Sequence, residues 1–218
     1  MKQPLVSLLH IASQINMRLS VVLVSLTWAL IELAKHQDKQ DKLRKDITRF
    51  SGVDPTWDQL VSDLPYLDAT VNEVLRLHPP VTETLRVAGQ DDVIPLGTPV
   101  VTPSGETISS ITIAKGTSVL APIRCINRSE ALWGPTAKVF EPERWFTDVA
   151  VGAKELQGYR HLLTFHDGPR TCLGRAFALA EFKARIFFPR ICFRSVCVDR
   201  ASAGGVICPH PELYLRVS

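Results

Sequence analysis

A single cysteine, Cys172, lies in the stretch FHDGPRTCLG between two glycines, Gly168 and Gly174. Glycine permits positive φ angles and a close approach of the backbone to a flat ligand, and Pro169 stiffens the turn. The amphipathic run behind the cysteine predicts a helix whose positive end faces the sulfur, and Arg170 adds positive charge. Each effect favours the thiolate, which is the form that attacks a substrate or binds a metal.

A thiolate in this setting fits a nucleophile, a redox centre or a metal ligand. A buried structural cysteine is the simpler alternative, because free cysteine is among the most buried residue types. A nucleophile would need a histidine base, and His161 and His166 are near in sequence, but no oxyanion-hole pattern accompanies them. These interpretations stay open on the local sequence alone.

A second candidate cluster pairs an acid with a base. Glu73 and Arg76 lie three residues apart in EVLR, on one face of a predicted helix, where a surface pair contributes only tenths of a kcal/mol. Apolar neighbours and the prolines at 79 and 80 favour a buried pair instead, which needs further partners to offset its desolvation. Arg144 in EPERW is such a partner, since its proline-rich, non-periodic segment suits a wrap over a helix.

The elements that position these residues are mainly helical. Residues 19–50 pass from apolar to charged and predict one long helix or two consecutive ones. A turn-rich connection, SGVDPTWDQL, is expected next. Another helix then begins near a Ser62 or Asp63 cap, with Pro65 in its first turn, and ends at the prolines. A further helix is expected after Gly174, interrupted at Pro189.

The middle of the chain has a different character. Residues 84–122 are rich in β-formers cut by Gly and Pro, and a hairpin is predicted around Ser104-Gly105. Residues 127–160 lack periodicity, and a loop of this length usually serves a function or wraps around another element. The predicted fold class is mainly α with a small β portion, in a single domain over residues 1–218.

Composition narrows the function classes. A net charge of +3 is too small to indicate a nucleic-acid partner. Five cysteines without C-x-x-C spacing fit neither a disulfide framework nor a zinc site. The longest apolar run, from Leu19 to Ile31, falls short of the ~20 residues that span a bilayer, so no membrane anchor is expected in this chain.

Three motifs occur in order along the chain, EVLR, EPERW and FHDGPRTCLG. Together they resemble the C-terminal half of a cytochrome P-450, the haem-thiolate monooxygenases, and are most similar to the fungal microsomal type. The last motif matches the family pattern F-x-x-G-x-R-x-C-x-G at every specified position. The resemblance covers residues 20–188, whereas residues 1–19 and 189–218 depart from the family.

The resemblance implies a role for each site residue. Cys172 would be the axial ligand of the iron of haem b, with Phe165 packed near the sulfur and the glycines Gly168 and Gly174 shaping the loop. Arg170 and Arg86 would bind the haem propionates. Glu73, Arg76 and Arg144 would form the structural triad of the family. Arg175 and Lys183 could face an acidic reductase, a solvated face being the alternative for Lys183.

The implied activity is insertion of one oxygen atom from dioxygen into a small organic substrate, a reaction of an oxidoreductase that acts on paired donors. Electrons would come from NADPH through NADPH-cytochrome P-450 reductase. The implied location is the endoplasmic reticulum membrane, or the cytoplasm if this chain is the whole protein.

The chain departs from the family in the central helix. Family members carry an acid followed by threonine there, and aligned without gaps this chain has Ser20 and Val21 in their place. Valine cannot relay a proton. Pro189 and the residues behind it also fit the family poorly. The alternative hypothesis is therefore a truncated, non-catalytic haem-binding or interaction fragment.

Overall fold

The structure, a computed structural model, describes residues 21–50 and 54–187. Its N-terminal part consists of two helices, at residues 21–35 and at Gln37–Ile47 (α2), followed by a 3₁₀ turn at Thr48–Phe50 (η1). The first helix stops before His36, whose Nδ1 lies 2.9 Å from the carbonyl oxygen of Glu32. Of the one or two helices expected here, the chain forms two. Ser20 and Pro189 lie outside the described residues.

The expected turn-rich connection is partly wrong, because its second half forms helix α3 at Trp57–Ser62. Thr56 and Gln59 make a capping box: Gln59 N donates to Thr56 Oγ1 at 3.3 Å, and Thr56 N donates to Gln59 Oε1 at 2.9 Å. Two otherwise unpaired backbone groups are thereby satisfied, which stabilises a helix start that the Pro and Gly nearby seemed to oppose.

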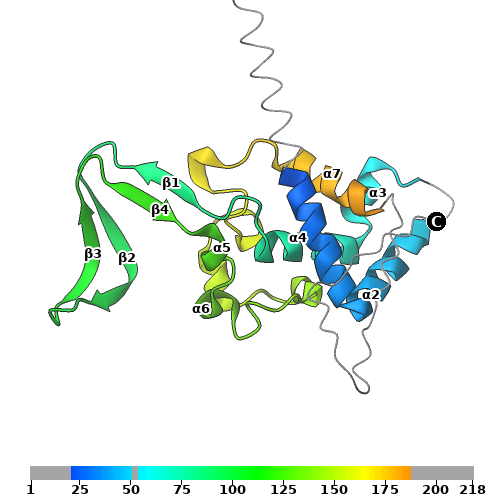
Figure 1. Ribbon diagram of the computed structural model, residues 1–218, viewed down its shortest axis with the longest axis horizontal. Coiled ribbons are helices and arrows are strands. Elements are labelled where there is room, and N and C mark those ends of the chain that lie inside the picture. The colour runs from blue at the N-terminus through cyan, green and yellow to red at the C-terminus, as the bar shows by residue number, and fades with distance from the viewer. Residues whose placement is uncertain (1–20, 51–53, 188–218) are drawn as a thin grey trace, which may run out of the picture.

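Helix α4, Pro65–Leu77, runs through the middle of the helical body (Figure 1), and every residue from Tyr66 to Leu77 except Asp68 is buried. The predicted cap at Ser62 or Asp63 is wrong. Its N-cap is Leu64, and the backbone N–H groups of Tyr66 and Leu67 instead donate to Asp46 Oδ2 at 2.9 and 3.2 Å. A carboxylate from α2 thus caps α4 across the core.

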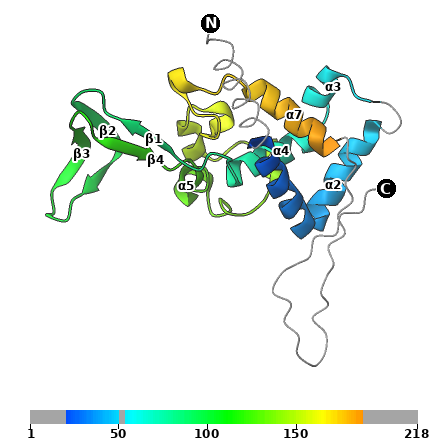
Figure 2. The same cartoon turned by 45° about the horizontal axis from the view of Figure 1, so that its top comes forward.

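The four strands form an arm that extends from the helical body (Figures 1 and 2). Strand β1 (Thr84–Val87) pairs antiparallel with β4 (Ser118–Ala121), and β2 (Asp92–Val101) pairs antiparallel with β3 (Thr107–Ile113). The β2–β3 turn contains Gly105 with a φ of +84°, which confirms the predicted hairpin and explains its glycine.

The remaining segment carries short helices: α5 (Ile123–Ile126), α6 (Glu130–Trp133), η2 (Pro142–Phe146), η3 (Val151–Glu155), η4 (Tyr159–His161) and η5 (Gly168–Arg170). Helix α7 then spans Arg175–Phe187. One hydrophobic core joins the 21–35 helix, α2, α3, α4 and α7. The fold is mainly α with a small β portion, consistent with part of a cytochrome P-450 fold. Over the residues described, no helix has the length and apolar character needed to cross a membrane.

Candidate functional site

The Glu73 carboxylate is fully buried and accepts five hydrogen bonds. Arg76 donates from Nε at 3.0 Å and from Nη2 at 2.9 Å, and Arg144 donates from Nε at 2.9 Å. The Trp145 indole and the Glu141 backbone N–H each add a bond of 3.0 Å. The structure thus brings together the three residues of the predicted triad, and these donors offset the desolvation of the charges.

Arg76 extends this network to the loops around it. Its Nη1 donates to the carbonyl oxygens of Asn127 and Ala137 at 2.9 and 2.5 Å. Its guanidinium carbon lies 5.1 Å from the centroid of the Trp133 ring, within the range of a cation–π contact. A fully buried side chain of α4 thus bonds to the main chain of the long loop at two separate points.

Asn127 connects the triad to the cysteine loop. Its Nδ2 donates to Thr164 Oγ1 at 2.8 Å, and its Oδ1 accepts from the Leu163 backbone N–H at 3.2 Å. The Thr164 hydroxyl in turn donates to the carbonyl oxygen of Leu75 at 2.8 Å. The sequence analysis did not single out Asn127, which follows α5, or Thr164, which directly precedes the FHDGPRTCLG motif. Only their burial distinguishes them from ordinary loop residues.

Three backbone features form the loop that carries Cys172. Gly168 has a φ of +64°, in a region that residues other than glycine rarely adopt. The Cys172 N–H donates to the Phe165 carbonyl oxygen at 2.9 Å, which closes the loop on itself. Helix α7 begins directly afterwards, at Arg175. A Cβ atom added at Gly174 would lie 4.0 Å from Cys172 Sγ, an ordinary contact.

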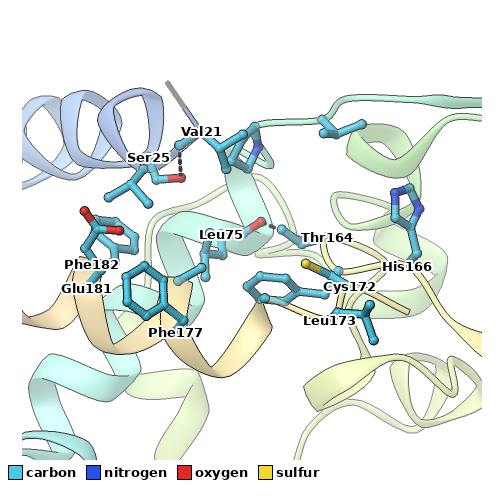
Figure 3. Close-up of a pocket in the computed structure, with 16 residues that line it drawn as sticks. Val21, Ser25, Leu75, Thr164, His166, Cys172, Leu173, Phe177, Glu181 and Phe182 are labelled. Carbon is cyan, nitrogen blue, oxygen red and sulfur yellow. Dashed lines mark hydrogen bonds between the residues drawn. The ribbon is translucent and has the colours of Figure 1, made fainter. Parts of the chain in front are cut away.

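A cavity of about 450 Å³ lies beside this loop. Figure 3 shows the 21–35 helix on one side and α7 on the other, with the sulfur of Cys172 directed into the space between them. The lining is mainly apolar and comes from the 21–35 helix, α4, the segment after α4, the cysteine loop and α7. Its apolar members include Val21, Val22, Leu75, Val81, Phe165, Leu173, Phe177 and Phe182, and its polar members include Ser25, Thr164, His166 and Glu181.

The residues that line the cavity have the chemistry that a haem requires. The Cys172 side chain is exposed on a mainly apolar wall, which suits a haem-thiolate ligand. Leu173, Phe177 and Val81 retain 104%, 59% and 42% of their accessible surface, so a flat apolar group resting here would cover surface that water otherwise contacts. Among the described residues, no cluster of three or more His, Cys, Asp and Glu side chains is placed to bind a metal ion directly.

The nucleophile alternative finds no support in the contacts of the cysteine. His166 lines the same cavity, but over the described part of the chain no hydrogen bond joins Cys172 Sγ to a histidine ring. His161 instead approaches the Leu156 carbonyl oxygen, with its Nδ1 at 3.0 Å. The buried structural cysteine is wrong, because Cys172 is exposed.

The two arginines expected at propionates lie outside the cavity lining. Arg170 is exposed at the end of η5, close in sequence to Cys172. Arg86 is exposed on β1, where its Nη1 donates to Thr84 Oγ1 at 2.6 Å and to the Leu85 carbonyl oxygen at 2.9 Å. The positions of both therefore leave their propionate role a prediction.

The expectation for Lys183 is wrong. This residue is buried on α7, and its Nζ lies 2.7 Å from Asp68 Oδ1 and donates to the Val61 carbonyl oxygen at 2.8 Å, so it faces neither solvent nor a partner. Arg175 is half-buried, with its guanidinium carbon 4.8 Å from the centroid of the Tyr159 ring. Helical spacing predicted that both residues follow the cysteine on one helix, but it does not predict that Asp68 packs on Lys183 and Tyr159 on Arg175.

The 21–35 helix contributes Val21 to the cavity wall, at the position aligned with the threonine of the family. Ser25 Oγ donates to the Val21 carbonyl oxygen at 3.2 Å, so its hydroxyl is committed to the helix itself. The other end of this helix is held by a buried pair, His78 Nε2 and Glu32 Oε1, 2.8 Å apart. The hydrogen bond to His78 lowers the pKa of Glu32, although burial opposes the shift.

Comparison with known proteins agrees with this geometry. The sequence model of the cytochrome P-450 family matches residues 22–188. The chain is 63% identical to cytochrome P-450 monooxygenase claP of Ampulloclitocybe clavipes over 164 residues, 75% of this chain and 31% of that protein. It is 57% identical to claO of the same fungus over 84% of this chain and 34% of that protein.

A more distant relative is cytochrome P-450 monooxygenase 128 of Postia placenta, 43% identical over 74% of this chain and 29% of that protein. The chain thus spans about a third of the length of the curated relatives that it matches. The family match covers most of the described residues, including the Glu73 network and the cysteine loop. The chain belongs to the cytochrome P-450 family.

Proposed function

We propose that this chain binds haem b through Cys172 and acts as a haem-thiolate monooxygenase, which inserts one oxygen atom of dioxygen into a small organic substrate. NADPH would supply the electrons through NADPH-cytochrome P-450 reductase, at the endoplasmic reticulum membrane. The observation that carries the proposal is the exposed Cys172 sulfur on the wall of an apolar cavity. Family membership, which implies a haem cofactor, supports it.

Thiolate-ligated haem activates dioxygen because the ligand pushes electron density that favours O–O cleavage. The residues of the chain would bind and orient this group. Phe165 and Leu173 would exclude water around the sulfur, and Arg170 and Arg86 would neutralise the propionates. Glu73, Arg76 and Arg144 would hold the loops that support the cysteine. Phe177 and the 21–35 helix would close the apolar walls.

Haem binding without oxygenation is a second candidate function, and the character of Val21 favours it. A valine lines the cavity where the family pattern has a threonine, and its side chain has no group that donates or relays a proton. Ser25 is one turn away, but its hydroxyl bonds to a carbonyl oxygen of the helix. The chain would then bind haem and carbon monoxide, but it would form no oxygenated product from NADPH and dioxygen.

The first experiment is to express the full chain with haem supplied, reduce it under carbon monoxide and record the Soret band. The wild type is expected to give the red-shifted band of a thiolate ligand, and Cys172→Ala to lose it. Cys125→Ala is the matched control, since Cys125 is also an exposed free cysteine and should leave the band unchanged. A band of imidazole type that persists in Cys172→Ala, or no haem uptake, would refute the proposal.

The two candidate functions then separate on turnover. With reductase and NADPH, a monooxygenase yields oxygenated product, whereas a non-catalytic haem protein yields none. Val21→Thr is the informative variant, because it restores one proton-relaying hydroxyl at the cavity wall. Product from the wild type would remove the second candidate.

A further inference from the structure

The carboxylate of Asp68, in the first turn of α4, is shared by three side chains from three parts of the chain. Its Oδ1 lies 2.7 Å from Lys183 Nζ on α7. Its Oδ2 accepts from Arg160 Nη2 on η4 at 2.7 Å and from Asn72 Nδ2 at 3.1 Å. Asp68 is the one residue between Tyr66 and Leu77 that is not buried, and its bond to Arg160 joins residues 92 positions apart in the sequence.

The two cations on Asp68 flank the cysteine loop. Arg160 lies on η4 before the loop and Lys183 lies within α7 after it, so the short helix that leads into the loop and the helix that follows it bind the same carboxylate. The pair with Lys183 is buried, with side-chain exposures of 5% for the lysine and 20% for the aspartate. A buried ammonium depends on its partner, because charge removed from water without one is costly.

The entry to the loop also needs an anchor. Arg160 and His161 have φ angles of +50° and +62°, and His166 has a φ of +58°. Residues other than glycine rarely adopt positive φ, and this conformation is retained where surrounding contacts impose it. The bond from Arg160 to Asp68 is a tertiary contact at this strained stretch, because it reaches across 92 residues of sequence.

We propose that Asp68 is a positioning residue, which holds the Cys172 loop against α4 by binding Arg160 before the cysteine and Lys183 after it. The proposal deepens the proposed function, since the loop it positions is the one that carries the iron ligand. Asp68 itself lies outside the cavity lining and touches no reacting atom. Asn72 supports the arrangement, as its Nδ2 also donates to the Asp68 carbonyl oxygen at 2.8 Å.

Amide hydrogen exchange on the full chain without haem tests the proposal, using Asp68→Asn. The reporter amides are Cys172, which bonds to the Phe165 carbonyl, and Leu162, which bonds to the Tyr159 carbonyl. The reference amide is Gly116 in the strand arm, which bonds to the Ala88 carbonyl. We expect exchange at both reporters to rise about tenfold or more, as local opening becomes easier, with the reference unchanged.

Asp148→Asn is the matched control, because that carboxylate is 99% exposed and pairs with Lys154 at 3.8 Å. Arg160→Gln is the milder variant in case Asp68→Asn fails to fold, since Arg160 is 40% exposed. It should accelerate Leu162 more than Cys172. An equal rise at reporters and reference, or no rise at the reporters, would overturn the proposal.

A second readout concerns the ligand itself. With haem supplied, Asp68→Asn should reduce the share of the thiolate-type carbon monoxide band relative to Asp148→Asn, as the sulfur leaves its position. Exchange is measured without haem, so failure of the chain to bind haem would refute the proposed function while the exchange result still decides the role of Asp68. An unchanged share of the thiolate-type band in Asp68→Asn would contradict the positioning role.

Discussion

The helical body around α4 and the strand arm differ in how they treat apolar side chains. In the body, Leu67 and Val71 are completely buried. In the arm, Val87 is 63% exposed and Val101 is 65% exposed. The arm consists of two separate two-stranded sheets and projects away from the body (Figure 2). The body has a shared core, whereas the arm depends on strand pairing.

Polar groups show the same contrast. In the body, the Glu73 carboxylate is buried and accepts five hydrogen bonds, two of them from Arg76 and one from Arg144, so its negative charge is neutralised inside the protein. In the arm, the Arg86 side chain is exposed, and its hydrogen bonds among the described residues go to Thr84 and Leu85 of its own strand. Isolated two-stranded sheets are marginally stable in water. The stability of the chain should therefore reside in the body, which also holds the cysteine loop.

The largest expected effect is that of Glu73→Ala. It leaves the buried guanidinium of Arg76 without its carboxylate, and breaking a buried ion pair costs about 3–5 kcal/mol of unfolding free energy. Chemical denaturation of the full chain measures this. Glu130→Ala breaks an exposed pair with Lys138 and should leave the midpoint unchanged. Equal losses from both variants would erase the contrast between buried and exposed charge.

A matched pair of substitutions compares the two regions directly. Val71→Ala removes buried methyl groups from the core of α4 and should lower the free energy of unfolding by about 2 kcal/mol. Val101→Ala removes the same groups from an exposed position on β2 and should change it by less than about 0.5 kcal/mol. Both are measured by the same denaturation experiment. A larger loss from Val101→Ala would mean that the arm packs against something in solution.

A smaller effect is expected at Glu143, which joins η2 to α2 and α4. Burial alone would raise its pKa, but hydrogen bonds from Lys42 and Lys39 lower it to about 2. Tyr66 also donates to this carboxylate at 3.0 Å, and burial together with that bond raises the pKa of the Tyr66 hydroxyl. A depressed carboxyl pKa contributes stability above its ordinary value of 4.5 and loses it as pH falls toward 2.

Glu143→Gln should therefore cost about 1 kcal/mol at neutral pH, a figure reduced for the solvent that screens this partly exposed group. The variant and the wild type should converge in stability between pH 4.5 and 2. Denaturation midpoints across that range test this. A stability difference that persists at pH 2 would show that packing, rather than charge, is what Glu143 contributes.

The sequence predicted the elements with strong local signals. Helix α4 has Pro65 at its start and prolines after its end, and the β2–β3 hairpin has Gly105 at a positive φ, so both follow from local backbone preferences. Helix α3 was missed because it has only six residues and directly follows turn-forming residues. The cap of α4 was misplaced because Asp46 supplies it from another helix.

The candidate site divides in the same way. Motif order was enough to group Glu73, Arg76 and Arg144, which the structure brings into contact. The sequence did not indicate that Asn127 and Thr164 link this cluster to the cysteine loop, since the two residues lie 37 positions apart and meet only in the folded chain. Their roles come from contacts between segments that are distant in sequence.

The family, the fold class and the cysteine that faces the cavity can be predicted from the amino-acid sequence, because local backbone preferences and motif residues specify them within short segments. The burial of Lys183 against Asp68, and the bonds of one carboxylate to residues before and after the Cys172 loop, are visible only once the chain is folded. Burial and charge pairing depend on which segments come together in space. The residues next to Lys183 or Asp68 in the sequence therefore do not reveal this contact.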